Sequence, residues 1–388
     1  MKKILYFSLL VVIYSCSSGA TTEAPAGDHD AAFQALLPES LESGYDQFKG
    51  VSMSVYAPEL NINWSGAEGY RDAEKENELS ADNPFRIASM TKTFVAAAIL
   101  RLHEMDSLSV HSSISKHISA VHDSILREGG YDTDAITIQQ CLSHTSGIYD
   151  YAMAGNTYVE LVRNNPQKVW TRTEQLQIAM DTGKPVGKPG ERYRYGDTGY
   201  ILLGEIIEHK TGMNLGKALR SLLKYEALGL RLTWLEAIEE KPEKSLPYVS
   251  RYFRGIDATE WHPSMDLYGG GGLVSTSTDL AIFLQSLFSG KVFDKKETLD
   301  MMIAPVVYAT SYNPQKDPSH KDYRSGVWQV PLYGMDAYMH KGVWGSTFIV
   351  IPELKASIAT NYTRGNAERM IKKAALIVKN VHDKKVDL

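Results

Sequence analysis

Cysteine is scarce in this sequence: there are two in 388 residues, Cys16 and Cys141. The surroundings of Cys16 predict its modification in an exported protein, and Cys141 then has no partner for an intrachain disulfide. The fold must therefore be stabilised by its core alone. A chain of this length with 43% hydrophobic residues can supply such a core.

Several binding signatures are also missing. The net charge is −5, and Lys and Arg are scattered among Asp and Glu without a basic patch, so no nucleic acid partner is expected. The eleven histidines show no metal-ligand spacing, so we predict no metal and no cofactor. The glycine run at 269–272 lacks the lysine of a phosphate loop and instead predicts a close approach of two backbone segments.

The first residues lack an apolar run long enough to span a bilayer comfortably. Lys2 and Lys3 precede a short apolar stretch over residues 4–13. A charged start followed by such a stretch is typical of a secretory signal, so residues 1–15 are predicted to be a signal peptide.

The segment IYSC (13–16) resembles a bacterial lipoprotein cleavage site, which predicts lipidation of Cys16 as the first mature residue. An ordinary signal peptide with a chance cysteine is the alternative. Ser17 to about Asp30 is small and polar, and residues 16–40 are predicted to be a tether. We therefore expect an exported protein of the bacterial cell envelope that faces the periplasm and touches the membrane only through its lipid anchor.

Strand patterns stand near both ends of the folded part. GVSMSVYA (50–57) alternates apolar and polar residues, and NINWSGAEG (61–69) follows after a turn, which predicts a β-hairpin. An amphipathic helix, AERMIKKAALIVKNV (367–381), closes the chain. Four strand-like segments precede this helix: SGVWQV (325–330), DAYMHKG (336–342), STFIVI (346–351) and ASIATNYT (356–363).

The predicted fold class is α+β: one antiparallel sheet built from both chain termini and flanked by helices, with an inserted, mostly helical domain. The folded domain is predicted over residues 41–388. Its sheet subdomain comprises about 41–85 and 290–388, and its helical subdomain about 86–289.

The first candidate site is a polar cluster that opens an apolar helix. Asn83-Pro84 ends any helix from upstream, and residues 94–100 are apolar on every side, as in a core helix. Ser89 and Lys92 then lie at i and i+3 on one face, near the helix start. Lys92 could accept the serine proton if burial and the helix dipole depress its pKa, and free N–H groups there could hold an oxyanion.

A bare S-x-x-K pattern is more often a helix cap followed by a solvated lysine, so partner motifs are needed. Four segments follow FRIASMTKTFVAAAIL (85–100) in order: LSHTSGIYDY (142–151), KPGERYRYGDTGYILLGEIIEHKTG (188–212), LYGGGGLVSTSTDLAIFL (267–284) and YMHKGVWGSTFIVI (338–351). Together they resemble the serine β-lactamase and penicillin-recognising family. The match is to its class C-like branch, which includes D,D-carboxypeptidases, class C β-lactamases, D-aminopeptidases and esterases. It covers roughly residues 45–375.

The resemblance implies catalytic roles for three residues. Ser89 is expected to be the acylated nucleophile and Lys92 its proton partner, and Tyr195 matches the tyrosine of the family's Tyr-x-Asn motif, a general acid/base. Neither Tyr nor Lys is a good base alone at neutral pH, but in a dry cleft the two can share one proton. His144, in SHTSG, is expected to belong to a structural turn.

The resemblance also assigns a third motif, His-x-Gly, to His340 and Gly342, on the sheet edge beside the nucleophile. The backbone N–H groups of Ser89 and Val343 would form the oxyanion hole. His340 in place of the lysine of many members weakens the positive charge that a β-lactam carboxylate meets. Strand alternation points Lys341 away from the face of His340.

Asp197 occupies the usual Asn position of the Tyr-x-Asn motif. A carboxylate only accepts hydrogen bonds unless protonated, so Asp197 would repel anionic or carbonyl-rich substrates, or pair with Lys92 and hold it charged. These departures argue against an efficient β-lactamase.

The sequence therefore predicts a serine hydrolase that acts through an acyl-enzyme on Ser89. A small-molecule or peptide substrate is expected, most simply a D-amino-acid cell-wall peptide cleaved in D,D-carboxypeptidase fashion. A carboxylesterase or weak class C-like β-lactamase on the same scaffold is the first alternative. A non-catalytic binding or sensor lipoprotein is the alternative from another class.

Overall fold

A computed structural model describes residues 28–42, 50–152, 156–253, 255–308, 322–363 and 367–386. The predicted signal peptide and Cys16 lie outside these residues. Among the residues described, no helix has both the length and the apolar character that crossing a bilayer requires.

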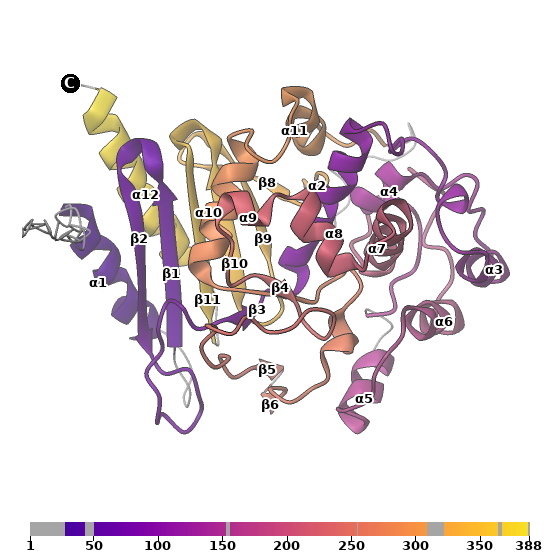
Figure 1. Cartoon of the computed structure of the whole chain (residues 1–388), viewed down its shortest axis with the longest axis horizontal. Coiled ribbons are helices and arrows are strands. Elements are labelled where there is room, and N and C mark those ends of the chain that lie inside the picture. The colour runs from indigo at the N-terminus through magenta and orange to yellow at the C-terminus, as the bar shows by residue number, and fades with distance from the viewer. Residues whose placement is uncertain are drawn as a thin grey trace, which may run out of the picture.

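One six-stranded sheet combines both ends of the chain, as predicted (Figure 1). Its strand order is β2-β1-β11-β10-β9-β8, and its neighbouring strands are antiparallel. The N-terminal hairpin joins the C-terminal strands where Val51 pairs with Tyr362. The strands are β1 (Gly50–Ala57), β2 (Ile62–Gly69), β8 (Trp328–Leu332), β9 (Met335–Lys341), β10 (Ser346–Ile351) and β11 (Ala356–Tyr362).

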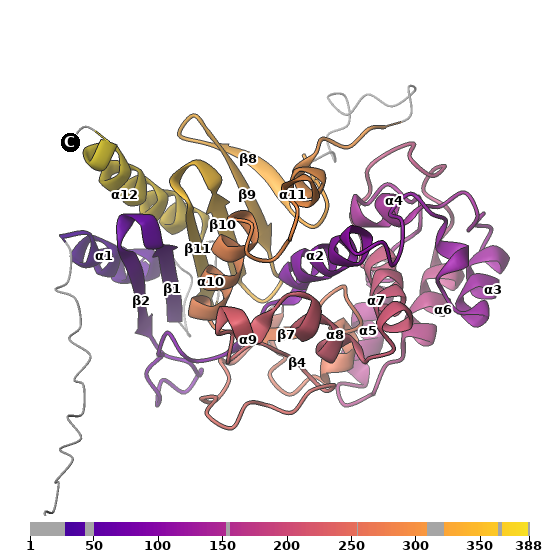
Figure 2. The ribbon, with the colours of Figure 1, turned by 45° about the horizontal axis from the view of Figure 1, so that its top comes forward.

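Helices cover both faces of this sheet (Figures 1 and 2). The apolar residues of β1, such as Val51 and Met53, join one buried cluster with α1 (Asp28–Glu42) and α12 (Glu368–Val386). The alternate residue Ser54 faces the other side, where its hydroxyl donates to Ser277 at the start of α10 (Ser277–Phe288). The period-two pattern of β1 thus assigns its two faces.

Two predicted boundaries are wrong. Residues 28–40 are not a tether, because helix α1 folds against the sheet and its Phe33 and Leu37 are fully buried. The helical subdomain does not extend to residue 289 either. Helix α10 packs on the sheet, where Ser357 donates a 2.6 Å hydrogen bond to the carbonyl of Ala281.

The middle of the chain is mainly helical, as predicted. Its helices are α2 (Thr91–Glu104), α3 (Ala120–Glu128), α4 (Ile138–Leu142), α5 (Thr157–Asn164), α6 (Arg172–Thr182), α7 (Thr198–Thr211), α8 (Leu215–Leu222), α9 (Tyr225–Leu228) and α11 (Lys296–Ile303). Short strands β3 (Phe85–Arg86), β7 (Leu273–Ser275) and β4 (Trp234–Leu235) form a small sheet, and β5 (Tyr252–Phe253) pairs with β6 (Ile256–Asp257).

Helix α2 is the core helix that its apolar sequence predicts. Nearly all of its residues are buried, and Phe94 stacks on Phe283 of α10 with ring centroids 3.9 Å apart. Figure 2 shows α2 between the sheet and the helices of the middle segment. The N-terminus of α2 therefore lies where the two parts of the fold meet.

Candidate active site

Ser89 lies in a 3₁₀ turn, Ala88–Met90, that leads directly into α2. Ala88 has a φ of 46°, a left-handed conformation that is uncommon for a residue other than glycine and costs about 1–2 kcal/mol. The preceding Ile87 is held by the Ser346 hydroxyl, which donates to its carbonyl at 3.1 Å. The surrounding structure thus holds a strained backbone next to Ser89, as is common at functional sites.

Lys92 is fully buried and extends toward Ser89. Its Nζ lies 3.0 Å from Ser89 Oγ, 2.6 Å from the carbonyl oxygen of Gly270 and 2.5 Å from Oδ1 of Asp197. Burial alone would lower the pKa of Lys92, but the negative charges of Asp197 and its neighbours outweigh it and raise the pKa above the ordinary value. The predicted depression of this pKa is wrong, and the structure favours the alternative in which Asp197 keeps Lys92 charged.

Tyr195 lies on the loop before α7, and its side chain extends toward Ser89 and Lys92. Its ring centroid is 5.1 Å from Lys92 Nζ, and its hydroxyl is close enough to Ser89 and Lys92 for both to act on its pKa. Burial raises the pKa of Tyr195 to about 12, although the charge of Lys92 and the proximity of Ser89 act in the opposite direction. The ring stacks on Trp328, with centroids 5.6 Å apart. Tyr195 therefore holds its proton at rest next to Ser89.

The ring of His144 packs against the ring of Tyr195. His144 lies in the turn that follows α4, with a left-handed φ of 57°, and its ring centroid is 4.4 Å from that of Tyr195. Its backbone carbonyl accepts a 2.8 Å hydrogen bond from the N–H of Arg194. The geometry agrees with a structural turn and places the histidine against the tyrosine ring.

His340 is fully buried on β9. Burial and the nearby charge of Lys92 lower its pKa to about 3, so the ring is neutral at physiological pH. Its Nε2 lies 3.2 Å from the hydroxyl of Tyr323. Lys341 points to the opposite face, as predicted, and pairs with Glu368 of α12 at 3.0 Å. The third motif thus supplies no positive charge to the face of His340.

Strand β8 pairs outside β9 from Met335 to Met339, and the motif residues His340 and Gly342 lie beyond the end of that pairing. The turn after β9 contacts the nucleophile segment. A Cβ at Gly342 would lie 2.3 Å from the carbonyl oxygen of Ile87, so only glycine fits there. Among the residues described, the N–H groups of Ser89 and Val343 have no protein acceptor. Both are available for a substrate oxygen.

Two further carboxylates, which the motifs do not predict, surround Lys92. Asp150 Oδ1 accepts from the N–H groups of Asp197 (2.6 Å) and Thr198 (3.2 Å) at the start of α7. Burial and the charge of Asp197 raise the pKa of Asp150, and likewise that of Asp266, to about 7. Both aspartates lie within or beside the matched segments, but lone aspartates in loops give no signal of their own.

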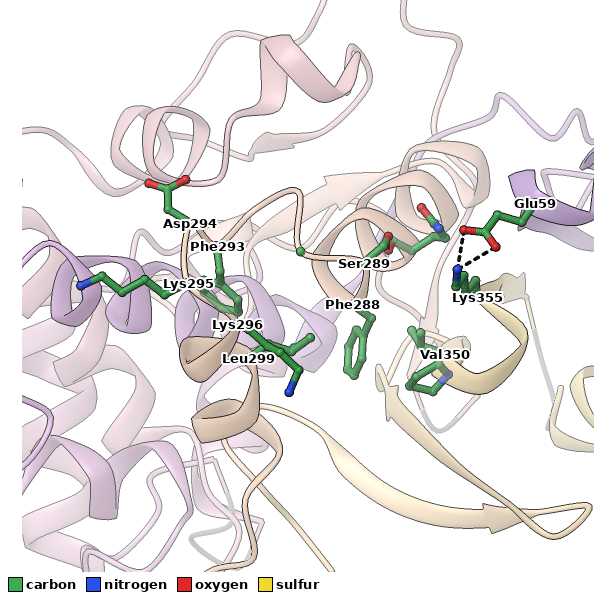
Figure 3. Close-up of a pocket in the computed structure, with 13 residues that line it drawn as sticks. Glu59, Phe288, Ser289, Phe293, Asp294, Lys295, Lys296, Leu299, Val350 and Lys355 are labelled. Carbon is green, nitrogen blue, oxygen red and sulfur yellow. Dashed lines mark hydrogen bonds and ion pairs between the residues drawn. The ribbon is translucent and has the colours of Figure 1, made fainter.

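A separate pocket of about 520 Å³ lies at the C-terminal end of α10 (Figure 3). Phe288, Leu299 and Val350 line it, and the ion pair between Glu59 and Lys355 lies at one end. It contains none of the predicted site residues.

Comparison with known proteins identifies the family and the fold of the chain. The family described as Beta-lactamase matches residues 39–381. Penicillin-binding protein 4* of Bacillus subtilis (strain 168) is 24% identical over 273 residues, which are 67% of this chain and 56% of that protein. Protein flp of Staphylococcus aureus (strain NCTC 8325 / PS 47) is 29% identical over 196 residues, 46% of this chain and 37% of that protein. The chain therefore spans only part of the length of these relatives.

Solved structures share the fold along nearly the whole chain. A D-stereospecific amidohydrolase from Streptomyces sp. has a TM-score of 0.71 at 26% identity, and the match covers 88% of this chain and 97% of that one. A D-amino acid amidase from Ochrobactrum anthropi SV3 has a TM-score of 0.73 at 24% identity, with 92% and 100% covered. The penicillin-binding protein homologue from Pyrococcus abyssi scores 0.70 at 24% identity, with 86% and 74% covered.

The family match and the fold place this chain among proteins of the serine hydrolase class, in which a serine hydroxyl attacks the substrate. The family match extends over most of the chain, and the solved structures share the fold over nearly the same residues. The chain belongs to the beta-lactamase family.

Proposed function

We propose that the protein hydrolyses an amide or peptide bond of a D-amino-acid derivative through an acyl-enzyme on Ser89. The observation that carries the proposal is the convergence of Lys92 Nζ and the Tyr195 hydroxyl on Ser89 Oγ. The available N–H groups of Ser89 and Val343 support it, since such a pair can stabilise the oxyanion of a tetrahedral intermediate.

The charge of Lys92 makes Tyr195 the immediate proton acceptor in this proposal. In the active form Tyr195 has released its proton to solvent, and the Lys92 ammonium stabilises the resulting phenolate. Ser89 Oγ attacks the carbonyl carbon as its proton passes to this phenolate oxygen, which leaves Tyr195 neutral. The same proton then passes to the leaving amine as the C–N bond breaks. Water, deprotonated by the same route, hydrolyses the ester at Ser89 and restores the free serine.

Two observations favour amides over β-lactams. The neutral His340 offers no charge to the carboxylate of a β-lactam, and Asp197 places a carboxylate where an amide is expected in the family. The D-configuration is proposed because the D-stereospecific amidohydrolase of Streptomyces sp. is similar over 97% of its length.

A substrate panel tests the proposal. The wild-type protein and Ser89→Ala are incubated with D-phenylalanine amide, its L-enantiomer and a chromogenic cephalosporin. We expect release of ammonia from the D-amide by the wild type alone, with the L-amide and the cephalosporin turned over at least about tenfold more slowly. Preference for the cephalosporin, or equal turnover in Ser89→Ala, would contradict the proposal.

A further inference from the structure

The charges around the nucleophile do not balance. Within the described part of the chain, Asp150, Asp197 and Asp266 act on or near Lys92, and the cations of this group are Lys92 and Arg86. Lys92 is paired with Asp197. Arg86 is bound in two places by its own carboxylate, Glu236, at 2.5 and 3.2 Å, and donates to the carbonyl of Trp261. Two of the three aspartates are therefore left without a cation.

Asp266 is the less satisfied of these two. Asp150 accepts several hydrogen bonds at the start of α7, whereas the Asp266 carboxylate has no hydrogen-bond donor among the residues that the structure describes. It lies against the backbone of Gly271, where a Cβ would be 2.2 Å from Oδ1. The adjacent Gly270 carbonyl accepts from Lys92. Asp266 thus lies at the site, is only partly buried, and has no hydrogen-bond donor within the described part of the chain.

The hydroxyl of Tyr151, near the same carboxylates, also lacks a hydrogen-bond partner among the described residues. Tyr151 is fully buried. Its hydroxyl is close enough to Asp197, Asp266 and Asp150 for their charges to act on it. A buried hydroxyl without a partner is rare in native structures, and it marks this group of carboxylates as one whose polar contacts the described residues do not complete.

We propose that the acyl part of the substrate carries a protonated amine and that Asp266 binds it. The inference rests on the proposed function, because it assigns the substrate class of the same site. The neutral His340 agrees with it, since His340 adds no positive charge that would repel the amine. Asp266 is in this view a specificity residue that acts on substrate binding and takes no part in proton transfer to Ser89.

Two p-nitroanilides that differ only in the amine test the proposal: those of D-alanine and of propionic acid. The full chain is assayed in detergent at pH 7, where a large share of the amine is protonated, as wild type and as Asp266→Asn. Asp106→Asn removes the same charge from an exposed position after α2 and serves as the matched control. We expect wild type to prefer the D-alanyl substrate by at least about tenfold in kcat/KM. Asp266→Asn should reduce that preference by about tenfold to hundredfold, the range for a hydrogen bond to a charged group, and Asp106→Asn should not.

A second readout needs neither turnover nor a variant. D-Alaninamide should slow the labelling of wild-type Ser89 by a fluorophosphonate at concentrations where propionamide does not. Equal protection by the two amides, or an equal preference in wild type and Asp266→Asn, would overturn the inference. It would indicate that water and the spare Nη1 of Arg86 satisfy Asp266. Absence of any labelling of Ser89 would overturn the proposed function and the inference together.

Discussion

Nζ of Lys92 lies 2.5 Å from Oδ1 of Asp197, and this buried ion pair keeps the lysine charged beside the nucleophile. A charged lysine cannot accept the proton of Ser89. It can instead stabilise the phenolate form of Tyr195, whose ring centroid lies 5.1 Å from the same Nζ. The pair therefore assigns electrostatic support to the lysine and proton transfer to the tyrosine.

Tyr195→Phe should slow the labelling of Ser89 by a fluorophosphonate by about 10²–10⁴-fold, the usual contribution of a general base. The ring remains to stack on Trp328, so the melting temperature should change little. Tyr193→Phe removes a hydroxyl from the same aromatic cluster and should label within about threefold of wild type. Equal losses in the two variants would contradict the role of Tyr195.

Asp197→Asn should move the pH dependence of labelling to lower pH. Asp197 raises the pKa of Lys92 and that of Tyr195, so its removal lowers both and frees a proton acceptor at lower pH. We expect the rising limb of the labelling rate to move down by about one pH unit. If the rising limb of the labelling rate lies at the same pH in Asp197→Asn as in the control Asp106→Asn, Asp197 does not control the proton acceptor.

Gly342→Ala should impair labelling of Ser89 far more than it impairs folding. The new methyl group would lie 2.3 Å from the Ile87 carbonyl, so the turn carrying Val343 must move away from the nucleophile. A displacement of about 1 Å reduces catalysis by about a hundredfold. Gly334→Ala, in the turn between β8 and β9, is the control. Its φ of 82° makes alanine strain the backbone, but no described atom lies within 4 Å of the added Cβ. Similar labelling rates for the two variants would argue against an oxyanion role for this turn.

Asp266→Asn should stabilise the protein at pH 8 and much less at pH 5. The pKa of Asp266 is raised to about 7 in the folded state by burial and by Asp197, against about 4 when unfolded. A raised acid pKa favours folding below pH 4, and this advantage disappears as pH rises through 7. A difference of about three pKa units corresponds to about 4 kcal/mol, so the variant should gain up to about 4 kcal/mol over wild type at pH 8 and about 1 kcal/mol at pH 5, measured by denaturant unfolding. A larger gain at pH 5 than at pH 8 would contradict the raised pKa.

The sequence predicts those parts of the site that follow from local pattern. Ser89 and Lys92 are three residues apart before an apolar helix, and that spacing alone brings their side chains to one face. The alternation of β1 likewise predicts its two faces. Helix α1 is missed because its first residues are small and polar, and its burial depends on contacts with strands distant in sequence.

The electrostatics could not be read from the sequence. Whether Lys92 is neutral or charged depends on Asp197 and Asp266, which lie more than a hundred residues along the chain. Nothing in the surroundings of a lone aspartate indicates which lysine it will face. Long-range packing decides these pKa values, and so it decides which residue serves as the base.

Intact-mass spectrometry after incubation with a fluorophosphonate tests the central claim most directly. Wild type, Ser89→Ala and the exposed control Ser109→Ala are compared. Each protein is first shown to have the same melting temperature, so that a difference in labelling does not come from unfolding. The account predicts one adduct per chain on wild type and on Ser109→Ala, and none on Ser89→Ala. An adduct that persists on Ser89→Ala, or its absence from folded wild type, would contradict an activated serine at the start of α2.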